Sequence, residues 1–81
     1  MRAKVFVTPR QGILDPQGRA VESALSGLGF QGISDVHLGR FIVLEIDAPS
    51  RTAAEEAVRK MCEQLLANPT IEDFRFEVEP G

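Results

Sequence analysis

The side chains in this sequence that could do acid–base or nucleophilic chemistry are few and widely spaced. His37 is the sole histidine. An imidazole changes its charge near neutral pH, which makes His37 a candidate general base. It lies beside a predicted turn, however, and no serine or cysteine stands where it would form a recognisable nucleophile pair with it. We therefore interpret His37 as an ordinary surface residue.

The other reactive side chains also have simple structural explanations. Cys62, the sole cysteine, falls in the apolar stripe of a predicted helix, which is typical of a small buried hydrophobic residue. Asp15 precedes Pro16, an arrangement typical of a helix N-cap. Glu72 and Asp73 are neighbours on a predicted strand and should point to opposite faces, so they are not expected to chelate a cation from one side. The sequence predicts no catalytic residue, cofactor or metal site in this chain.

The loop of residues 12–18 (GILDPQG) is the remaining candidate site. It contains glycines and precedes a helix N-terminus, where free N–H groups can bind a phosphate. The loop does not match the Walker pattern of phosphate-binding loops and lacks its lysine. A structured strand-to-helix connection is the simpler interpretation.

Length and charge restrict the function further. The 81 residues should form one domain, residues 1–81, and a domain this small removes only about 60% of its unfolded surface from water. Self-association is therefore expected to add stability.

A net charge of −3, with nine Lys and Arg residues spread along the chain, gives no concentrated positive field to attract nucleic acid. One cysteine and no long apolar stretch favour a cytoplasmic protein without a membrane span.

Alternation of apolar and polar residues predicts the strands. Three segments alternate clearly, namely residues 2–8, 40–47 and 71–79. Residues 30–38 alternate less regularly, because Gly32 and Asp35 interrupt them, and we predict a short strand there.

Helical periodicity predicts two helices. The first begins at Asp15-Pro16 and ends at Gly29, with one apolar stripe that should pack on the sheet: Ala20, Val21, Ala24, Leu25 and Leu28. The second begins at a capping box of Thr52 and Glu55 and ends at Asn68-Pro69. Its predicted buried stripe consists of Ala54, Val58, Met61, Cys62, Leu65 and Leu66.

The order of elements is βαββαβ, which predicts an α+β fold of the ferredoxin-like type. Right-handed crossovers would place both helices on one face of a four-stranded antiparallel sheet. Strands 2–8 and 40–47 would be central neighbours, so that Phe6, Phe41 and Val43 meet on the face without helices. Because an exposed apolar patch of this kind needs a covering, we predict self-association through these three residues.

Four blocks of the sequence resemble the small subunit, PurS, of phosphoribosylformylglycinamidine synthase. They occur in the family's order at matching spacing over essentially the whole chain: residues 14–18 (LDPQG), 28–29 (LG), 38–42 (LGRFI) and 62–74 (CEQLLANPTIEDF). Residues 30–35 and 48–53 depart most from the family pattern.

The resemblance implies a non-catalytic subunit of an ATP-dependent ligase in purine biosynthesis. A separate glutaminase, PurQ, releases ammonia, and a separate large synthetase, PurL, uses it together with ATP and Mg²⁺. The small subunit joins the two and assists ammonia transfer. The family gives no established catalytic residues to carry over, and a homodimer or homotetramer is expected. A regulatory domain that binds a small ligand and, with less support, an RNA-binding module remain alternatives.

Loops held by a rigid scaffold commonly carry binding residues, so we expect partner contacts at the loop after the first strand and at the turn before the last. The residues predicted for this contact are Arg10, Gln11, Asp15, Gln17, Asn68 and Pro69.

Overall fold

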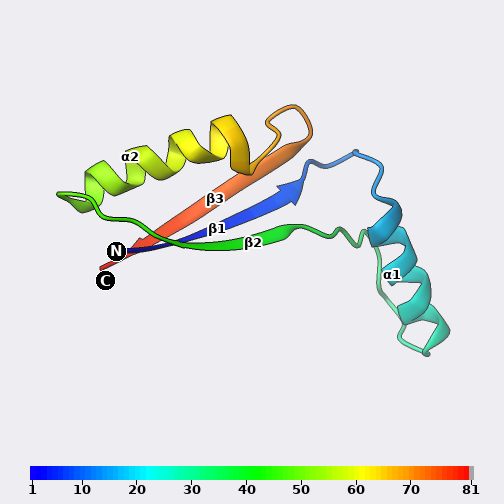
Figure 1. Cartoon of the computed structure of the whole chain (residues 1–81). Helices are drawn as coiled ribbons and strands as arrows, with labels where there is room; N and C mark the ends of the chain where they lie inside the picture. Colours follow the sequence, from blue (N-terminus) through cyan, green and yellow to red (C-terminus); the bar gives the residue numbers. More distant parts are fainter. Residues whose placement is uncertain (81) are drawn as a thin grey trace.

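The computed structural model describes residues 1–80, so that Gly81, the last residue of the predicted domain, lies outside the described part. The chain forms three strands, two helices and one π-helical turn (Figure 1). In order these are β1 (Arg2–Pro9), α1 (Pro16–Gly27), β2 (Arg40–Glu45), α2 (Arg51–Met61), η1 (Cys62–Leu66) and β3 (Glu72–Glu79). None of the helices described is long and apolar enough to cross a membrane.

The sheet has three antiparallel strands in the order β2-β1-β3, rather than the predicted four. The predicted neighbours do pair, since Phe6 of β1 lies opposite Phe41 of β2. On the other side, Val5 and Val7 of β1 lie opposite Phe76 and Phe74 of β3. The α+β class is therefore confirmed, but the four-stranded ferredoxin-like sheet is not present in residues 1–80.

The predicted strand at residues 30–38 is wrong. Gly32 and Asp35 have positive φ angles of 80° and 57°, which lie in the left-handed region and break an extended strand. Both residues were the interruptions visible in the sequence. The segment instead returns the chain from α1 to β2 without regular structure.

The hydrophobic core lies between α2 and one face of the sheet. Alternation along β1 buries Ala3, Val5 and Val7 completely, as predicted. From the helical side the core receives Ala54, Val58 and Cys62, which are also fully buried. The N-cap of α2 is Ser50, whose hydroxyl accepts the N–H of Ala53 at 3.1 Å, so the predicted cap at Thr52 is wrong by two residues.

The last turn of the second helix departs from the predicted buried stripe. At η1 the N–H of Ala67 donates to the carbonyl of Cys62, a π-helical step of five residues. The extra residue per turn rotates the following side chains. Leu65 is consequently 82% exposed and Met61 is also exposed, whereas both were predicted to be buried.

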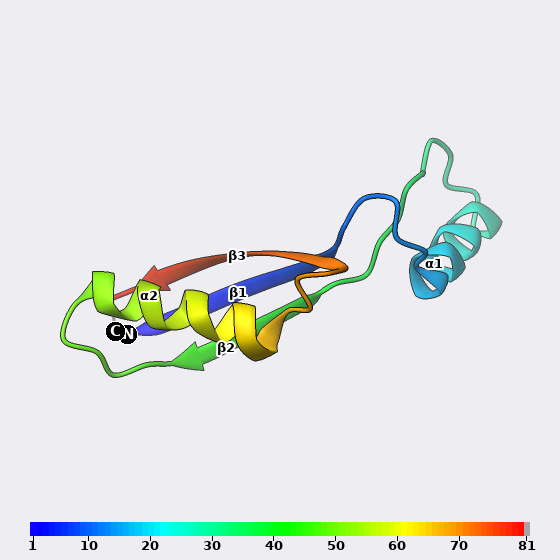
Figure 2. The ribbon, with the colours of Figure 1, turned by 90° about the horizontal axis from the view of Figure 1, so that it is seen from above.

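The first helix does not pack on the sheet, which corrects the prediction of two helices on one face. Together with the segments on either side, α1 forms an arm, residues 12–39, that extends beyond the end of the sheet (Figures 1 and 2). The Cα radius of gyration is 16.0 Å, against about 12 Å expected for a compact chain of this length. Val21 and Leu28 of the predicted stripe are exposed to solvent in the single chain.

Candidate functional site

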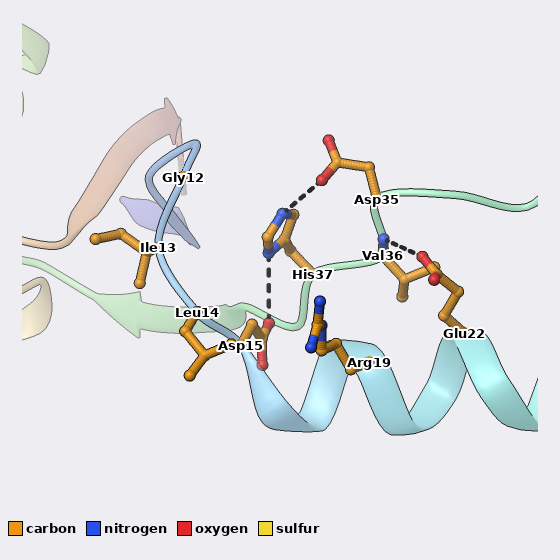
Figure 3. Close-up of a pocket in the computed structure, with 9 residues that line it drawn as sticks. All are labelled: Gly12, Ile13, Leu14, Asp15, Arg19, Glu22, Asp35, Val36 and His37. Atoms are coloured by element: carbon orange, nitrogen blue, oxygen red, sulfur yellow. Dashed lines mark hydrogen bonds and ion pairs between the residues drawn. The ribbon is translucent and has the colours of Figure 1, made fainter.

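A hollow at the base of the arm gathers several chemistry-bearing side chains. It has a volume of about 400 Å³ and lies between the start of α1 and the returning segment 35–37 (Figure 3). We call it the junction pocket. Its lining residues are Gly12, Ile13, Leu14, Asp15, Arg19, Glu22, Asp35, Val36 and His37.

Asp15 connects the two chain segments that meet in the junction pocket. Its Oδ1 accepts the N–H of Gly18 at 2.9 Å, which confirms the predicted N-cap. Its Oδ2 accepts the N–H of Leu38 at 2.8 Å, from the returning segment. The N–H of Gly18, followed by that of Leu38, keeps the pKa of Asp15 below its ordinary value, because both bonds favour the ionised carboxyl. Asp15 is thus bonded within the chain, and its contact with a partner stays a prediction.

The same two segments also approach closely through their backbones. A Cβ atom at Gly18 would overlap the carbonyl oxygen of Val36, so this position on α1 requires glycine. One turn further along α1, Oε1 of Glu22 accepts the N–H of Val36 at 3.5 Å. The base of the arm is therefore held by contacts between α1 and residues 36–38.

His37 lies between two carboxylates rather than on an open surface. Its Nε2 is 3.0 Å from Oδ1 of Asp35, and its Nδ1 is 3.6 Å from Oδ2 of Asp15 (Figure 3). The side chain is 26% exposed, and Nδ1 is shielded from solvent without a hydrogen-bond partner. The prediction of an ordinary surface histidine is wrong, because two carboxylates flank the ring. Part of the ring is exposed, as predicted.

The junction pocket contains no nucleophile beside the imidazole. None of its lining residues carries a hydroxyl or a thiol. Within residues 1–80 no group of three or more His, Cys, Asp or Glu side chains is placed to hold a metal ion. The lining has three carboxylates and one guanidinium, a balance that disfavours phosphate, and Asp15 already occupies the N–H of Gly18. The chemistry of the pocket suits internal contacts better than catalysis.

The other predicted loops meet at the same end of the sheet. The N–H of Arg10 donates to the carbonyl of Ile71 at 2.8 Å, and its Nε lies 3.3 Å from Oδ1 of Asp73. The loop after β1 thus adjoins the turn 67–71, which contains Asn68 and Pro69. Five of the six predicted contact residues are exposed here or at the base of the arm: Arg10, Gln11, Gln17, Asn68 and Pro69.

Arg40 and Glu72, which the sequence analysis did not connect with each other, support this turn. Oε1 of Glu72 accepts the N–H of Asn68 at 2.8 Å and Nη2 of Arg40 at 2.9 Å. Nη2 of Arg40 also donates to the carbonyl of Leu66 at 2.7 Å. The N–H of Asn68, followed by the Arg40 guanidinium, keeps the pKa of Glu72 below its ordinary value. Arg40 and Glu72 stand 32 positions apart, so no local pattern reveals their contact.

The sheet face opposite α2, which we call the open face, carries the predicted apolar patch. The rings of Phe6 and Phe41 stack with centroids 4.9 Å apart. The guanidinium of Arg75 lies over the Phe6 ring, 4.0 Å from its centroid. Phe41 and Val43 remain 58% and 50% exposed in the single chain. The placement of the patch is confirmed, while its use in self-association stays a prediction.

These features define a small assembly module. Its core is modest, its arm and open face expose apolar side chains, and its polar groups hold loops in place. A model of the PurS family, described as phosphoribosylformylglycinamidine (FGAM) synthase, matches residues 2–80. The chain therefore belongs to the PurS family, as the four sequence blocks indicate.

Two curated relatives match this chain over nearly their whole length. The PurS subunit of phosphoribosylformylglycinamidine synthase from Mycobacterium leprae is 48% identical over 96% of this chain and 95% of the relative. The subunit of the same name from Bacillus subtilis is 42% identical over 96% of this chain and 92% of its own. Identity is thus spread along the chain and not confined to one motif.

Solved structures share the fold. Bacillus subtilis PurS superposes with a TM-score of 0.84 at 42% identity, covering 98% of both chains. A chain in the structure of PurLQS from Thermotoga maritima superposes with a TM-score of 0.85 at 32% identity, covering 94% of this chain and 93% of that one. The overall fold of this chain is therefore shared with these relatives.

Proposed function

We propose that this chain is the non-catalytic small subunit of a phosphoribosylformylglycinamidine synthase, in which it joins the glutaminase PurQ to the synthetase PurL. The observation that carries the proposal is the superposition on a chain of the Thermotoga maritima PurLQS structure over 94% of this chain. The subunit acts by holding the two active sites in register, so that ammonia released at one reaches the other.

The chemistry of the chain supports an assembly role. His37 and Asp15 are engaged with other residues of the junction pocket, and the sole cysteine is buried. Burial raises the pKa of the Cys62 thiol, which disfavours the nucleophilic thiolate. We therefore place ATP and Mg²⁺ in the large subunit and no cofactor in this one.

The proposed contact with the catalytic partners lies at the end of the sheet where the loop after β1 adjoins the turn 67–71. Arg10 and the exposed Asn68-Pro69 would present this surface, and the Arg40–Glu72 pair would hold it in one shape. A pre-shaped surface loses less conformational entropy when it binds. Gln11 and Gln17 would extend the contact toward the arm.

Self-association through the open face accompanies this role. Taking a fully exposed apolar side chain to full burial contributes roughly 1.5–3 kcal/mol, so Phe41 and Val43, which are about half exposed, would each contribute about half of that. The exposed arm adds further apolar surface that the single chain leaves in water. A homodimer is the simplest closed assembly, since two-fold symmetry is the commonest.

The two alternative functions gain no comparable support. RNA binding would use Phe6 and Phe41 as stacking rings, but Arg75 already covers the Phe6 ring and the net charge is −3. A ligand-sensing domain would use the junction pocket, whose carboxylates already accept hydrogen bonds from other groups of the chain.

Co-purification tests the proposal. A tagged chain should retain PurQ and PurL together, in a complex that elutes as one species in size-exclusion chromatography. Retention of RNA, of a small metabolite alone, or of neither catalytic protein would contradict the proposed function.

A further inference from the structure

The junction pocket contains a device that goes beyond the proposed function. The arm extends from the sheet, so its orientation depends on the few contacts at its base (Figure 2). One of these is the bond from the Leu38 N–H to Oδ2 of Asp15. The same carboxylate oxygen faces the ring of His37. A change in the charge of the ring therefore acts directly on the atom that ties the start of α1 to the returning segment.

The two acceptors beside His37 match the imidazolium better than the neutral ring. A neutral imidazole has one N–H, whereas the imidazolium has two. With Nε2 against Asp35 at 3.0 Å and Nδ1 facing Asp15 at 3.6 Å, a neutral ring must turn a lone pair toward one carboxylate. A protonated ring presents an N–H to each. Only the protonated ring can therefore donate to both carboxylates.

The charges of the other groups around the ring also favour a positively charged ring. From α1 the junction pocket receives Arg19 and Glu22, in addition to Asp15 at the cap and Asp35 on the returning segment. Three carboxylates thus face one guanidinium, and a proton on His37 reduces the excess of negative charge. Asp15 stays ionised near neutral pH, because the N–H groups of Gly18 and Leu38 keep its pKa below the ordinary value.

The backbone of the returning segment has a left-handed conformation at Asp35, whose carboxylate contacts the His37 ring. Asp35 has a φ of 57°, a left-handed conformation that few residues other than glycine, asparagine and aspartate adopt readily. That conformation accompanies the placement of its carboxylate 3.0 Å from the ring, two residues away. Asn at this position would keep the backbone and remove the charge.

We propose that His37 is a pH-sensitive latch at the base of the arm, closed when the imidazolium bridges Asp15 and Asp35 and loosened when the ring is neutral. Imidazole side chains in general change charge within about pH 5 to 8. A closed latch holds the start of α1 against the returning segment, which continues into β2. A loosened latch lets α1 move relative to that segment and present its apolar side chains differently.

Amide hydrogen exchange of the isolated chain, followed by NMR, tests the latch. After correction for the intrinsic pH dependence of exchange, Leu38 should be roughly two- to five-fold better protected at about pH 5 than at about pH 8, the size expected of a partly exposed ion pair. The Leu28 amide, which donates to Ala24 inside the arm, serves as an internal control and should show no such change.

Two variants sharpen the test. Asp35→Asn should at least halve the pH effect at Leu38 while leaving the far-ultraviolet circular dichroism unchanged, and His37→Gln should abolish the effect. Equal protection of Leu38 at both pH values in the unmodified chain would overturn the proposal. So would a pH effect that persists at full size in either variant. The measurement needs no catalytic partner, so its outcome is independent of the proposed function.

Discussion

The α2 region and the arm with α1 both contain a helix with an apolar stripe, but only the stripe of α2 packs against the sheet of the same chain. Both helices have an apolar stripe at helical spacing. In α2 the stripe buries Val58 completely, whereas in α1 Val21 is 36% exposed. An amphipathic pattern shows that a helix needs a partner, and it leaves open whether the partner is in the same chain. The arm is the region where that distinction decides the structure.

The largest expected effect concerns self-association at the open face. Val43→Asp places a carboxylate where an apolar interface is proposed, and an unpaired buried charge is costly. We expect the dissociation constant of the homo-oligomer to rise by at least about 100-fold, measured by sedimentation velocity over a range of concentrations.

Val43→Thr is the matched control, because it retains the β-branched shape without a charge and should weaken association far less. In the single chain Val43 is half exposed, so the aspartate variant should still fold. An aspartate variant that sediments like the unmodified protein would show that the open face is not the interface.

One substitution made in both helices compares the two regions directly. Val58→Ala removes fully buried methyl groups and should lower the free energy of unfolding by about 2 kcal/mol at any protein concentration. Val21→Ala should change it by less than about 0.5 kcal/mol when the chain is dilute and monomeric, because that side chain is partly in water.

At concentrations where the chain associates, Val21→Ala should become measurably destabilising in urea titrations followed by circular dichroism. An equally large loss in both variants at low concentration would mean that the arm packs on its own sheet in solution.

A smaller effect is expected from the carboxylate that supports the turn 67–71. Hydrogen bonds to Glu72 keep its pKa below the ordinary value, so its contribution to stability is present above that value and is lost as the pH falls through the lowered pKa. Glu72→Gln should cost about 1 kcal/mol near neutral pH, and the difference from the unmodified chain should vanish in acid.

Urea unfolding at a series of pH values measures this difference. Glu56→Gln on the exposed side of α2 provides the control, with little change expected at any pH. A cost for Glu72→Gln that is constant down to strong acid would contradict the assigned role of the ionised carboxylate.

The smallest effect on stability is expected where the partner contact is proposed. Arg10→Ala combined with Gln11→Ala removes an exposed ion pair with Asp73, so the thermal midpoint should hardly change. Binding to the catalytic partners, measured by titration calorimetry, should weaken. Loss of folding, or unchanged binding, would show that this loop has a structural role only.

The parts of the fold that the sequence predicts are those set by a periodic pattern of residues or by neighbours along the chain. Alternation placed Val5 and Val7 in the core, and the Asp15-Pro16 pair located the start of α1. The cap of α2 was misplaced because Ser50 and Thr52 are both good caps, and only the backbone geometry decides between them.

The candidate site was harder to predict because its contacts join distant residues. Asp15 was recognised as a cap, but nothing local shows that its second oxygen binds Leu38 or faces His37.

Two further features of the fold were also missed or misjudged. The π-helical step that exposes Leu65 has no sequence signature that periodicity detects. The missing strand at 30–38 was signalled by Gly32 and Asp35, whose left-handed conformations outweighed the weak alternation around them.

Reconstitution of the three proteins tests the bridging role most directly. Steady-state turnover is measured with glutamine and, separately, with ammonia as the nitrogen source, in the presence and absence of this chain. The proposed role predicts no glutaminase or synthetase activity in the isolated chain and a larger stimulation of glutamine-dependent than of ammonia-dependent turnover. Equal stimulation of both reactions would contradict a subunit that couples the two active sites.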